Sequence, residues 1–114
     1  MNYFEKRPWG TFENLLDTDY CKVKQIIIKP NQAPSYQYHF KRQEVWVVVQ
    51  GSGELRLDDS VTSVNEGQII HIPFESKHQI KNNTDRDLIF IEIQMGDYFG
   101  EDDIVRLEDS YGRI

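Results

Sequence analysis

The sequence predicts an all-β protein, and three observations support this prediction. Turn-forming residues recur at short intervals, as in Gln-Gly-Ser-Gly at residues 50–53 and Asn-Glu-Gly at residues 65–67. The stretches between these turns are rich in Val, Ile, Tyr and Phe, which suit a pleated, half-buried sheet. Apolar runs with the length and period of a helix are missing before the C-terminal tail. Many short strands separated by turns are typical of a β-sandwich or a small barrel.

The turns divide the chain into a series of expected strands. They cover residues 11–16, 21–29, 35–39, 44–50, 54–57, 63–64, 68–72, 78–81 and 87–94. After the last strand, three acidic residues at 101–103 come before Ile104 and Val105, and acidic residues favour the first turn of a helix. We therefore expect a short helical or irregular tail. The length suits one hydrophobic core, so residues 1–114 are expected to form a single domain.

Composition and charge exclude several kinds of partner. Thirteen Lys and Arg against nineteen Asp and Glu give a net charge of −6. Nucleic acid and anionic membranes bind basic surfaces, so this charge argues against both as partners. An anionic small molecule would need a local cluster of cations. The single cysteine, Cys21, excludes an internal disulfide framework and a thiolate metal cluster. The first residues contain no apolar run that suggests a signal peptide or a membrane span, so the expected location is the cytoplasm.

Two stretches combine possible metal ligands with turn residues. In the first, Gln37 and His39 are two residues apart, so on a strand their side chains lie on the same face. Glu44 begins the next strand and Gly51 ends it. The second stretch contains, in order, Gly67, Pro73, His78 and Asn82.

These two stretches resemble the paired motifs of the cupin superfamily. The motifs read (His/Gln)-x-His-x4-Glu-x6-Gly and Gly-x5-Pro-x4-His-x3-Asn, and every gap is intact here. The resemblance implies a double-stranded β-helix, or jelly-roll barrel, whose interior brings the two stretches together. It also implies that one metal ion is bound by four side chains, those of Gln37, His39, Glu44 and His78.

The chemistry of these four side chains is consistent with a metal site. Two imidazoles, a carboxylate and an amide oxygen suit a divalent ion, first zinc and alternatively iron, manganese, cobalt or nickel. The lack of thiolates argues against a purely structural zinc site. The competing interpretation is that a lone histidine on an apolar strand packs in the core or lies on the surface. His71 stays outside the ligand set, because the strand pleat could direct it either way.

Longer segments resemble one family within the cupins, the type II phosphomannose isomerase domain. This domain commonly forms the C-terminal part of bifunctional mannose-1-phosphate guanylyltransferase/mannose-6-phosphate isomerases. The similar segments are residues 7–10, 37–51, 72–73, 91–96 and 100–113, of which the last is specific to this family. Nothing in the chain resembles the glycine-rich guanylyltransferase domain, so the expected enzyme is a stand-alone isomerase without nucleotide transfer.

The resemblance implies a metal-dependent interconversion of mannose 6-phosphate and fructose 6-phosphate through a cis-enediol. A base must remove the proton from C2, and both Glu44 and Glu92 are candidates. Glu92 shares a strand face with Phe90 and Gln94, whereas Ile89, Ile91 and Ile93 share the other face. If the isoleucine face lines the barrel, Glu92 is a surface charge. Alternation alone does not decide between these readings.

The substrate phosphate needs cations near the barrel mouth. Lys41 and Arg42 lie in the turn between two strands of the first motif, and Arg113 lies in the tail, so these three are the expected phosphate ligands. Arg106, also in the tail, is expected to act in catalysis or on the phosphate. Each arginine could instead pair with acidic residues of the tail.

Two other functions remain open. One is another metal-dependent cupin enzyme, such as a dioxygenase, and the other is a non-catalytic sugar-binding module. The sequence departs from the family at Phe40, Lys41 and Val45, where more histidine is usual, and Glu75 stands where many cupins have glycine. Residues 45–49 and 89–93 are apolar on both strand faces, which predicts a sheet covered on both sides and hence a homodimer.

Overall fold

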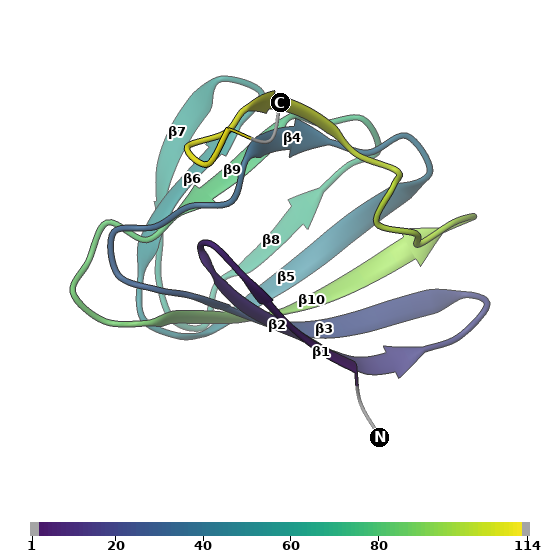
Figure 1. Ribbon diagram of the computed structural model, residues 1–114, viewed down its shortest axis with the longest axis horizontal. Helices are drawn as coiled ribbons and strands as arrows, with labels where there is room; N and C mark the ends of the chain where they lie inside the picture. Colours follow the sequence, from purple (N-terminus) through teal and green to yellow (C-terminus); the bar gives the residue numbers. More distant parts are fainter. Residues whose placement is uncertain (1–2, 113–114) are drawn as a thin grey trace.

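The computed structural model describes residues 3–112, and in this part of the chain two antiparallel sheets face each other (Figure 1). The larger sheet has the strand order β1-β2-β3-β10-β5-β8. Its strands are β1 (Tyr3–Arg7), β2 (Gly10–Asp17), β3 (Cys21–Ile28), β10 (Leu88–Gly96), β5 (Arg42–Gln50) and β8 (Ile69–Ile72). The smaller sheet has the order β11-β4-β9-β6-β7. Its strands are β11 (Val105–Glu108), β4 (Tyr36–Tyr38), β9 (His78–Lys81), β6 (Gly53–Leu57) and β7 (Ser60–Val64).

The predicted all-β architecture is confirmed, since residues 3–112 contain no helix. Each of the nine predicted strands is present, with its ends shifted by a few residues at most. Two further strands, β1 and β11, form edges of the two sheets and were not predicted. No helix in this part of the chain is suited to cross a membrane.

Of the two forms expected for the tail, helical or irregular, the helical one is wrong. Residues 101–103 form a turn and a bend, and β11 then pairs with β4 in antiparallel register. Val105 lies opposite Tyr38 and Arg106 lies opposite Gln37. The free edge of β4 offers backbone hydrogen bonds to the β-branched residues of the tail, and this pairing prevails over the weak preference of acidic residues for a helix N-terminus.

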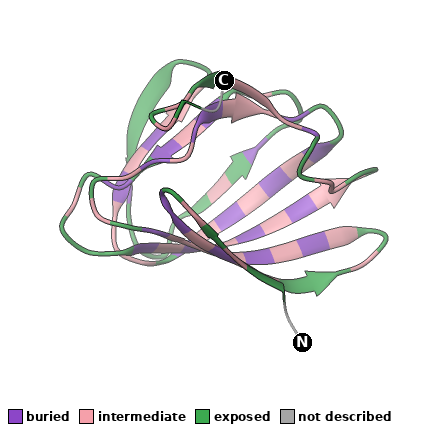
Figure 2. Cartoon of the chain, in the orientation of Figure 1, coloured by how far each residue is buried: buried purple, intermediate pink, exposed green. Residues whose placement is uncertain are grey.

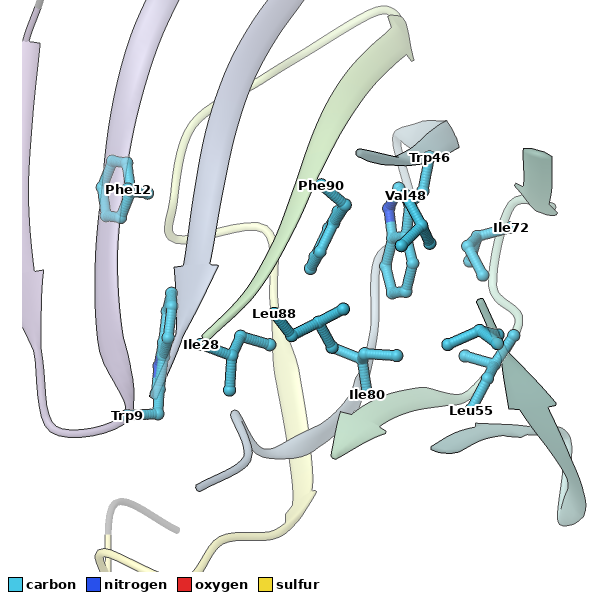
Figure 3. Close-up of a cluster of buried hydrophobic side chains, with 11 residues drawn as sticks. Trp9, Phe12, Ile28, Trp46, Val48, Leu55, Ile72, Ile80, Leu88 and Phe90 are labelled. Carbon is cyan, nitrogen blue, oxygen red and sulfur yellow. The ribbon is translucent and has the colours of Figure 1, made fainter. Parts of the chain in front are cut away.

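The core lies between the two sheets. On β5 and β10 buried residues alternate with half-buried ones, which appears as stripes along these strands in Figure 2. Trp46, Val48, Leu88 and Phe90 face the interior from the larger sheet, and Leu55 and Ile80 are buried on the smaller one (Figure 3). Complete burial of each such side chain contributes roughly 1.5–3 kcal/mol.

The turn residues of the motifs hold the strands in place. Gly51 has φ +82°, and a Cβ atom there would lie 2.6 Å from the carbonyl oxygen of Asp87, so glycine is required. Glu75, where glycine was expected, adopts the same left-handed region with φ 61°. Asn82 is fully buried, and its amide donates to the carbonyl oxygens of Ile28 and Arg86. Asn82 therefore connects the loop between β9 and β10 to the end of β3.

Candidate metal centre

A cavity of about 370 Å³ opens between the two sheets. Its wall mixes aromatic side chains, including Trp9, Trp46 and Phe90, with a set of ionisable ones. The ionisable residues are Arg7, Lys24, His39, Arg42, Glu44, His78, Glu92, Glu101, Asp102 and Arg106. A largely apolar pocket with a few convergent charged groups is the usual form of a small-molecule site.

Three of the four predicted metal ligands meet in this cavity. His39, from the segment after β4, Glu44, on β5, and His78, at the start of β9, each offer one ligand atom, and these atoms all lie within 4.8 Å of one another. All three residues are buried, with at most 4% of their surface exposed. One ion could contact all three side chains.

Both imidazoles are held so that Nε2 is the accepting nitrogen, and in His39 it lies 3.2 Å from Nη2 of Arg42, which a bound metal would have to displace. Nδ1 of His39 lies 2.7 Å from the carbonyl oxygen of Asp103, and Nδ1 of His78 lies 2.9 Å from that of Ser76. A carbonyl oxygen can only accept, so each Nδ1 carries the proton and donates it. Hydrogen bonds of this kind fix the orientation of histidines that bind metal.

Burial keeps the imidazoles neutral. It lowers the pKa of His39 to about 4, although the neighbouring Glu44 carboxylate raises it, and burial likewise lowers the pKa of His78. A neutral imidazole is the form that binds a metal. Both side chains are therefore ready to act as ligands at neutral pH.

Glu44 is ionised, and three neighbours stabilise its charge. Arg42 donates from Nε to Oε2 at 2.9 Å, Trp46 donates from Nε1 to Oε1 at 2.9 Å, and Glu92 shares a hydrogen bond with the same carboxylate. Burial alone would raise the pKa of Glu44. The charge of Arg42 lowers it well below the ordinary value.

Glu92 faces the cavity, and the isoleucines of β10 form the opposite, half-buried face. Burial, and after it the charge of Glu44 and the hydrogen bond with Glu44, raise the pKa of Glu92 well above its ordinary value. The proton shared by the two acids therefore resides on Glu92. Its Oε1 also accepts a bond of 3.1 Å from the amide of Gln94.

Gln37, the fourth predicted ligand, lies beside the cluster. It is opposite His78 on β9 and opposite Arg106 on β11. Side chains directly opposite each other in an antiparallel pair point to the same face, and all three line the cavity. A row of side chains from Arg106 through Gln37 to His78 therefore crosses the smaller sheet. It leads to His39, Glu44 and His78, which we call the metal-type cluster.

The predicted phosphate ligands lie in different places. Arg42 is buried deep in the cavity, where it bonds Glu44 and also places Nη2 3.2 Å from Nε2 of His39. The ammonium of Lys41 lies over the Tyr98 ring, 5.1 Å from its centroid and away from the cavity wall. Arg113 lies outside the described residues. His71 is exposed and bonded to Gln43, away from the cavity.

Several residues that shape the site were not predicted from the sequence. Asp103 holds the loop of His39, since its carboxylate accepts the backbone N–H groups of Phe40 and Lys41. Lys24 is buried on the cavity wall. On β3 it lies on the same strand face as Ile26 and Ile28. These two apolar residues are the feature of the sequence that could have indicated an inward-facing Lys24.

The side chains present fit a divalent metal. The cluster offers two neutral imidazole nitrogens and one ionised carboxylate, with the Gln37 amide in the next position along the sheet. Such a mixed nitrogen and oxygen set suits zinc, iron, manganese, cobalt or nickel. A metal held by these residues would keep positions open for water or a substrate.

The fold is that of the cupins. A cupin 2 conserved barrel domain protein from Salinispora arenicola has a TM-score of 0.67 at 19% identity, over 74% of this chain and 73% of that chain. The capsular polysaccharide assembling protein CapF from Staphylococcus aureus has a TM-score of 0.80 at 25% identity, over 95% of this chain and 33% of that chain. The predicted double-stranded β-helix is thereby confirmed.

Within the cupins the chain belongs to one family, described as mannose-6-phosphate isomerase C-terminal, which matches residues 2–109. The xanthan biosynthesis protein XanB of Xanthomonas campestris pv. campestris is 43% identical over 94% of this chain. The mannose-1-phosphate guanylyltransferase of Escherichia coli (strain K12) is 38% identical over 95% of this chain. The chain spans only 23% of the length of each relative.

Proposed function

We propose that this cupin catalyses the metal-dependent interconversion of mannose 6-phosphate and fructose 6-phosphate. The observation that carries the proposal is the meeting of His39, Glu44 and His78 in one cavity, with ligand atoms within 4.8 Å of one another. Membership of the mannose-6-phosphate isomerase C-terminal family supports this substrate. We further propose that the protein acts in the cytoplasm and that residues 1–114 are sufficient for this reaction.

In the proposed reaction the two imidazoles and Glu44 hold a divalent metal, with zinc as the first candidate. When bound, the metal supplies Lewis acidity toward the oxygens on C1 and C2 of the open-chain sugar. A carboxylate takes the proton from C2 of the aldose and returns it to C1, while the hydroxyl proton on O2 passes to O1. Glu44 and Glu92 both lie at the site, and either can carry the proton.

The two carboxyl groups differ in their protonation state. Glu44 is ionised and is also the proposed metal ligand, whereas Glu92 holds the shared proton. A metal held by Glu44 would offset the negative charge of this carboxylate, which is the main charge that raises the pKa of Glu92. Glu92 would then ionise more readily and be available as the base.

A coupled isomerase assay tests the proposal. Purified protein of residues 1–114 is assayed with mannose 6-phosphate as prepared, after chelation, and after zinc, manganese, cobalt, nickel or ferrous iron is added back. We expect turnover that chelation abolishes and one of these metals restores. The variant His78→Ala is expected to lose both metal binding and turnover.

The matched control is His71→Ala, which removes an exposed histidine that points away from the cavity. It is expected to keep wild-type turnover. Metal binding without turnover on either sugar phosphate would contradict the isomerase proposal and favour a sugar-binding module. Undiminished turnover in His78→Ala would contradict the ligand assignment.

A further inference from the structure

A buried lysine lies at the end of the cavity that the metal-type cluster does not occupy. Lys24, on β3, has only 3% of its surface exposed. Lysine is almost never buried to this extent unless its charge is paired. Across the sheet its neighbour on β10 is Glu92, but its ion-pair partner comes from a distant segment of the chain.

The partner comes from the tail. Glu101, 77 residues further along the chain, forms an ion pair with Nζ of Lys24. The ammonium also lies over the Phe12 ring, 4.2 Å from its centroid, and the guanidinium of Arg7 lies 5.4 Å from the same centroid. Both cations line the cavity. This end of the cavity thus has two positive side chains beside one aromatic ring, and Arg7, like Lys24, is paired with a carboxylate, that of Glu5.

The two members of the ion pair differ in their exposure to water. The side chain of Lys24 is 4% exposed, whereas that of Glu101 is 43% exposed. Two residues beyond Glu101, Asp103 anchors the tail to the loop of His39. Glu101 can therefore turn its carboxylate out to solvent without displacing the tail, but Lys24 remains in the cavity. Lys24 therefore stays in the cavity, whereas the carboxylate of Glu101 can be replaced by another anion.

The position of Lys24 suits an elongated ligand. Lys24 lies opposite Glu92, and Glu92 lies opposite Trp46 on β5, two residues from Glu44 on the same face. Strands in a sheet are about 4.8 Å apart, so the lysine is roughly 10 Å from the strand that carries Glu44. A ligand with a metal-binding end and an anionic end can contact both sites at once.

We propose that Lys24, with Arg7 beside it, is the anion subsite of this cavity, and that Glu101 is an internal competitor that occupies the subsite until a phosphate group displaces it. Identifying the ligand as a sugar phosphate rests on the proposed function. A phosphate group has more charge and more acceptor oxygens than a carboxylate, and on replacing Glu101 it would keep the buried ammonium paired. The exchange of Glu101 for phosphate is therefore favourable.

Titration calorimetry with inorganic phosphate at low salt tests the proposal. The full chain is compared with Glu101→Gln, Lys24→Met and Glu108→Gln. The last is the matched control, because Glu108 lies in the same tail but pairs with Arg56 outside the cavity. We expect Glu101→Gln to bind phosphate about fivefold more tightly, the scale of losing one partly exposed competitor. Lys24→Met is expected to bind at least about tenfold more weakly, and Glu108→Gln as the wild type.

Equal affinities in all four proteins would overturn the proposal. Weaker binding by Glu101→Gln would also overturn it, because Glu101 would then support the subsite and not compete for it. If Lys24→Met does not fold, the comparison of Glu101→Gln with Glu108→Gln decides alone. Phosphate binding requires no turnover, so a chain that lacks isomerase activity can still pass or fail this test.

Discussion

Nδ1 of His39 donates to the carbonyl oxygen of Asp103, 2.7 Å away and 64 residues further along the chain. The carboxylate of the same aspartate accepts the backbone N–H groups of Phe40 and Lys41. One residue of the tail therefore fixes both the tautomer of a proposed metal ligand and the loop that carries it. The tail, which looks from the sequence like a surface appendage, completes the metal-type cluster.

Replacing Asp103 by alanine is expected to weaken metal binding. The loop of His39 loses two charge-assisted hydrogen bonds, and supporting interactions of this kind are worth about 10- to 100-fold in metal affinity. Competition titration with a chromophoric chelator measures the change. Asp103→Asn keeps one acceptor and is expected to lie between alanine and wild type. Glu108→Ala, in the same tail but paired with Arg56, is the control, and an Asp103→Ala variant that binds metal as tightly as this control would contradict the anchoring role.

Arg42 supplies the positive charge that a buried Glu44 requires when no metal is bound. It donates to Glu44 from Nε at 2.9 Å, and both side chains are almost fully buried. Removing one partner of a buried ion pair leaves an uncompensated charge and costs about 3–5 kcal/mol. We expect Arg42→Met to lose stability on this scale in urea unfolding with a chelator present. Added zinc is expected to restore part of the loss, because a dication replaces the missing charge.

Arg56 is the matched control for Arg42. It pairs with Glu108 and Asp59, both of which are exposed. Exposed pairs contribute roughly 1 kcal/mol or less, so Arg56→Met is expected to have a small effect that zinc does not change. A loss in Arg42→Met no larger than in Arg56→Met would show that Glu44 does not depend on the guanidinium.

The low pKa of His39 predicts how stability depends on pH. Burial lowers it from 6.5 to about 4, so between these values the unfolded chain binds a proton that the folded protein does not. Stability from this residue is therefore complete above pH 6.5 and is lost as pH falls toward 4, by about 3 kcal/mol.

Urea unfolding of chelator-treated protein at several pH values checks this prediction. Glu92 contributes a slope of opposite sign, so the informative quantity is the difference between wild type and His39→Gln. We expect this difference to shrink as pH falls from 6.5 to 4. His71→Gln, at an exposed position, serves as the control. A difference that is constant across this range would contradict the lowered pKa.

The sequence was sufficient for the pattern of strands, because turns and β-rich stretches are local signals. The resemblance to the cupin motifs also predicted that Gln37, His39, Glu44 and His78 come together, and all four line the cavity. The strand β11 was missed because its only cue is the free edge of β4, and that edge exists only after folding. A prediction from local composition therefore favoured a helix.

The environments of two predicted site residues, Arg42 and Glu92, could not be derived from the sequence for a related reason. Arg42 follows a turn, which suggests a solvent-exposed cation. In the structure, however, Arg42 is the first of the alternate β5 side chains that face inward. The face of Glu92 was undecided from alternation because both faces of β10 carry apolar residues. Packing of β10 between β3 and β5, with the second sheet opposite, turns Glu92 toward the cavity. Such contacts between distant segments leave no mark on local periodicity.

The outer face of the larger sheet supports the predicted homodimer, which we retain as a proposal. Val45, Val47, Ile91 and Ile93 are half-buried on the side away from the cavity, and Ile69 is 72% exposed at the neighbouring edge strand. An apolar patch of this kind marks an interaction surface, and a second copy of the same face would cover it. Size-exclusion chromatography with light scattering is expected to give a dimer for the wild type and a monomer for Ile91→Arg. Val61→Arg, on the other sheet, is the control, and a monomeric wild type would contradict the proposal.

Replacing Glu92 by glutamine separates its chemical role from its structural one. Glutamine has the shape of the protonated acid, so it can still donate to Glu44 and accept from Gln94. The folded protein is therefore expected to keep its structure and its metal affinity. The raised pKa of Glu92 means that its contribution to stability is complete below pH 4.5 and is lost as pH rises through the folded value. Glu92→Gln cannot titrate, so its stability relative to wild type is expected to increase with pH.

Turnover decides whether Glu92 is the base. Loss of a general base costs about 10²- to 10⁴-fold in rate, so kcat for mannose 6-phosphate is expected to fall on this scale in Glu92→Gln while the metal content stays that of the wild type. Gln94→Glu is unsuitable as a control, because it would add a carboxyl group beside the site. Glu54→Gln, on β6 and outside the cavity lining, serves instead and is expected to keep wild-type kcat. If kcat in Glu92→Gln stays within about tenfold of wild type, proton transfer falls to Glu44, which would then have to release the metal or bind it through one oxygen while the other takes the proton.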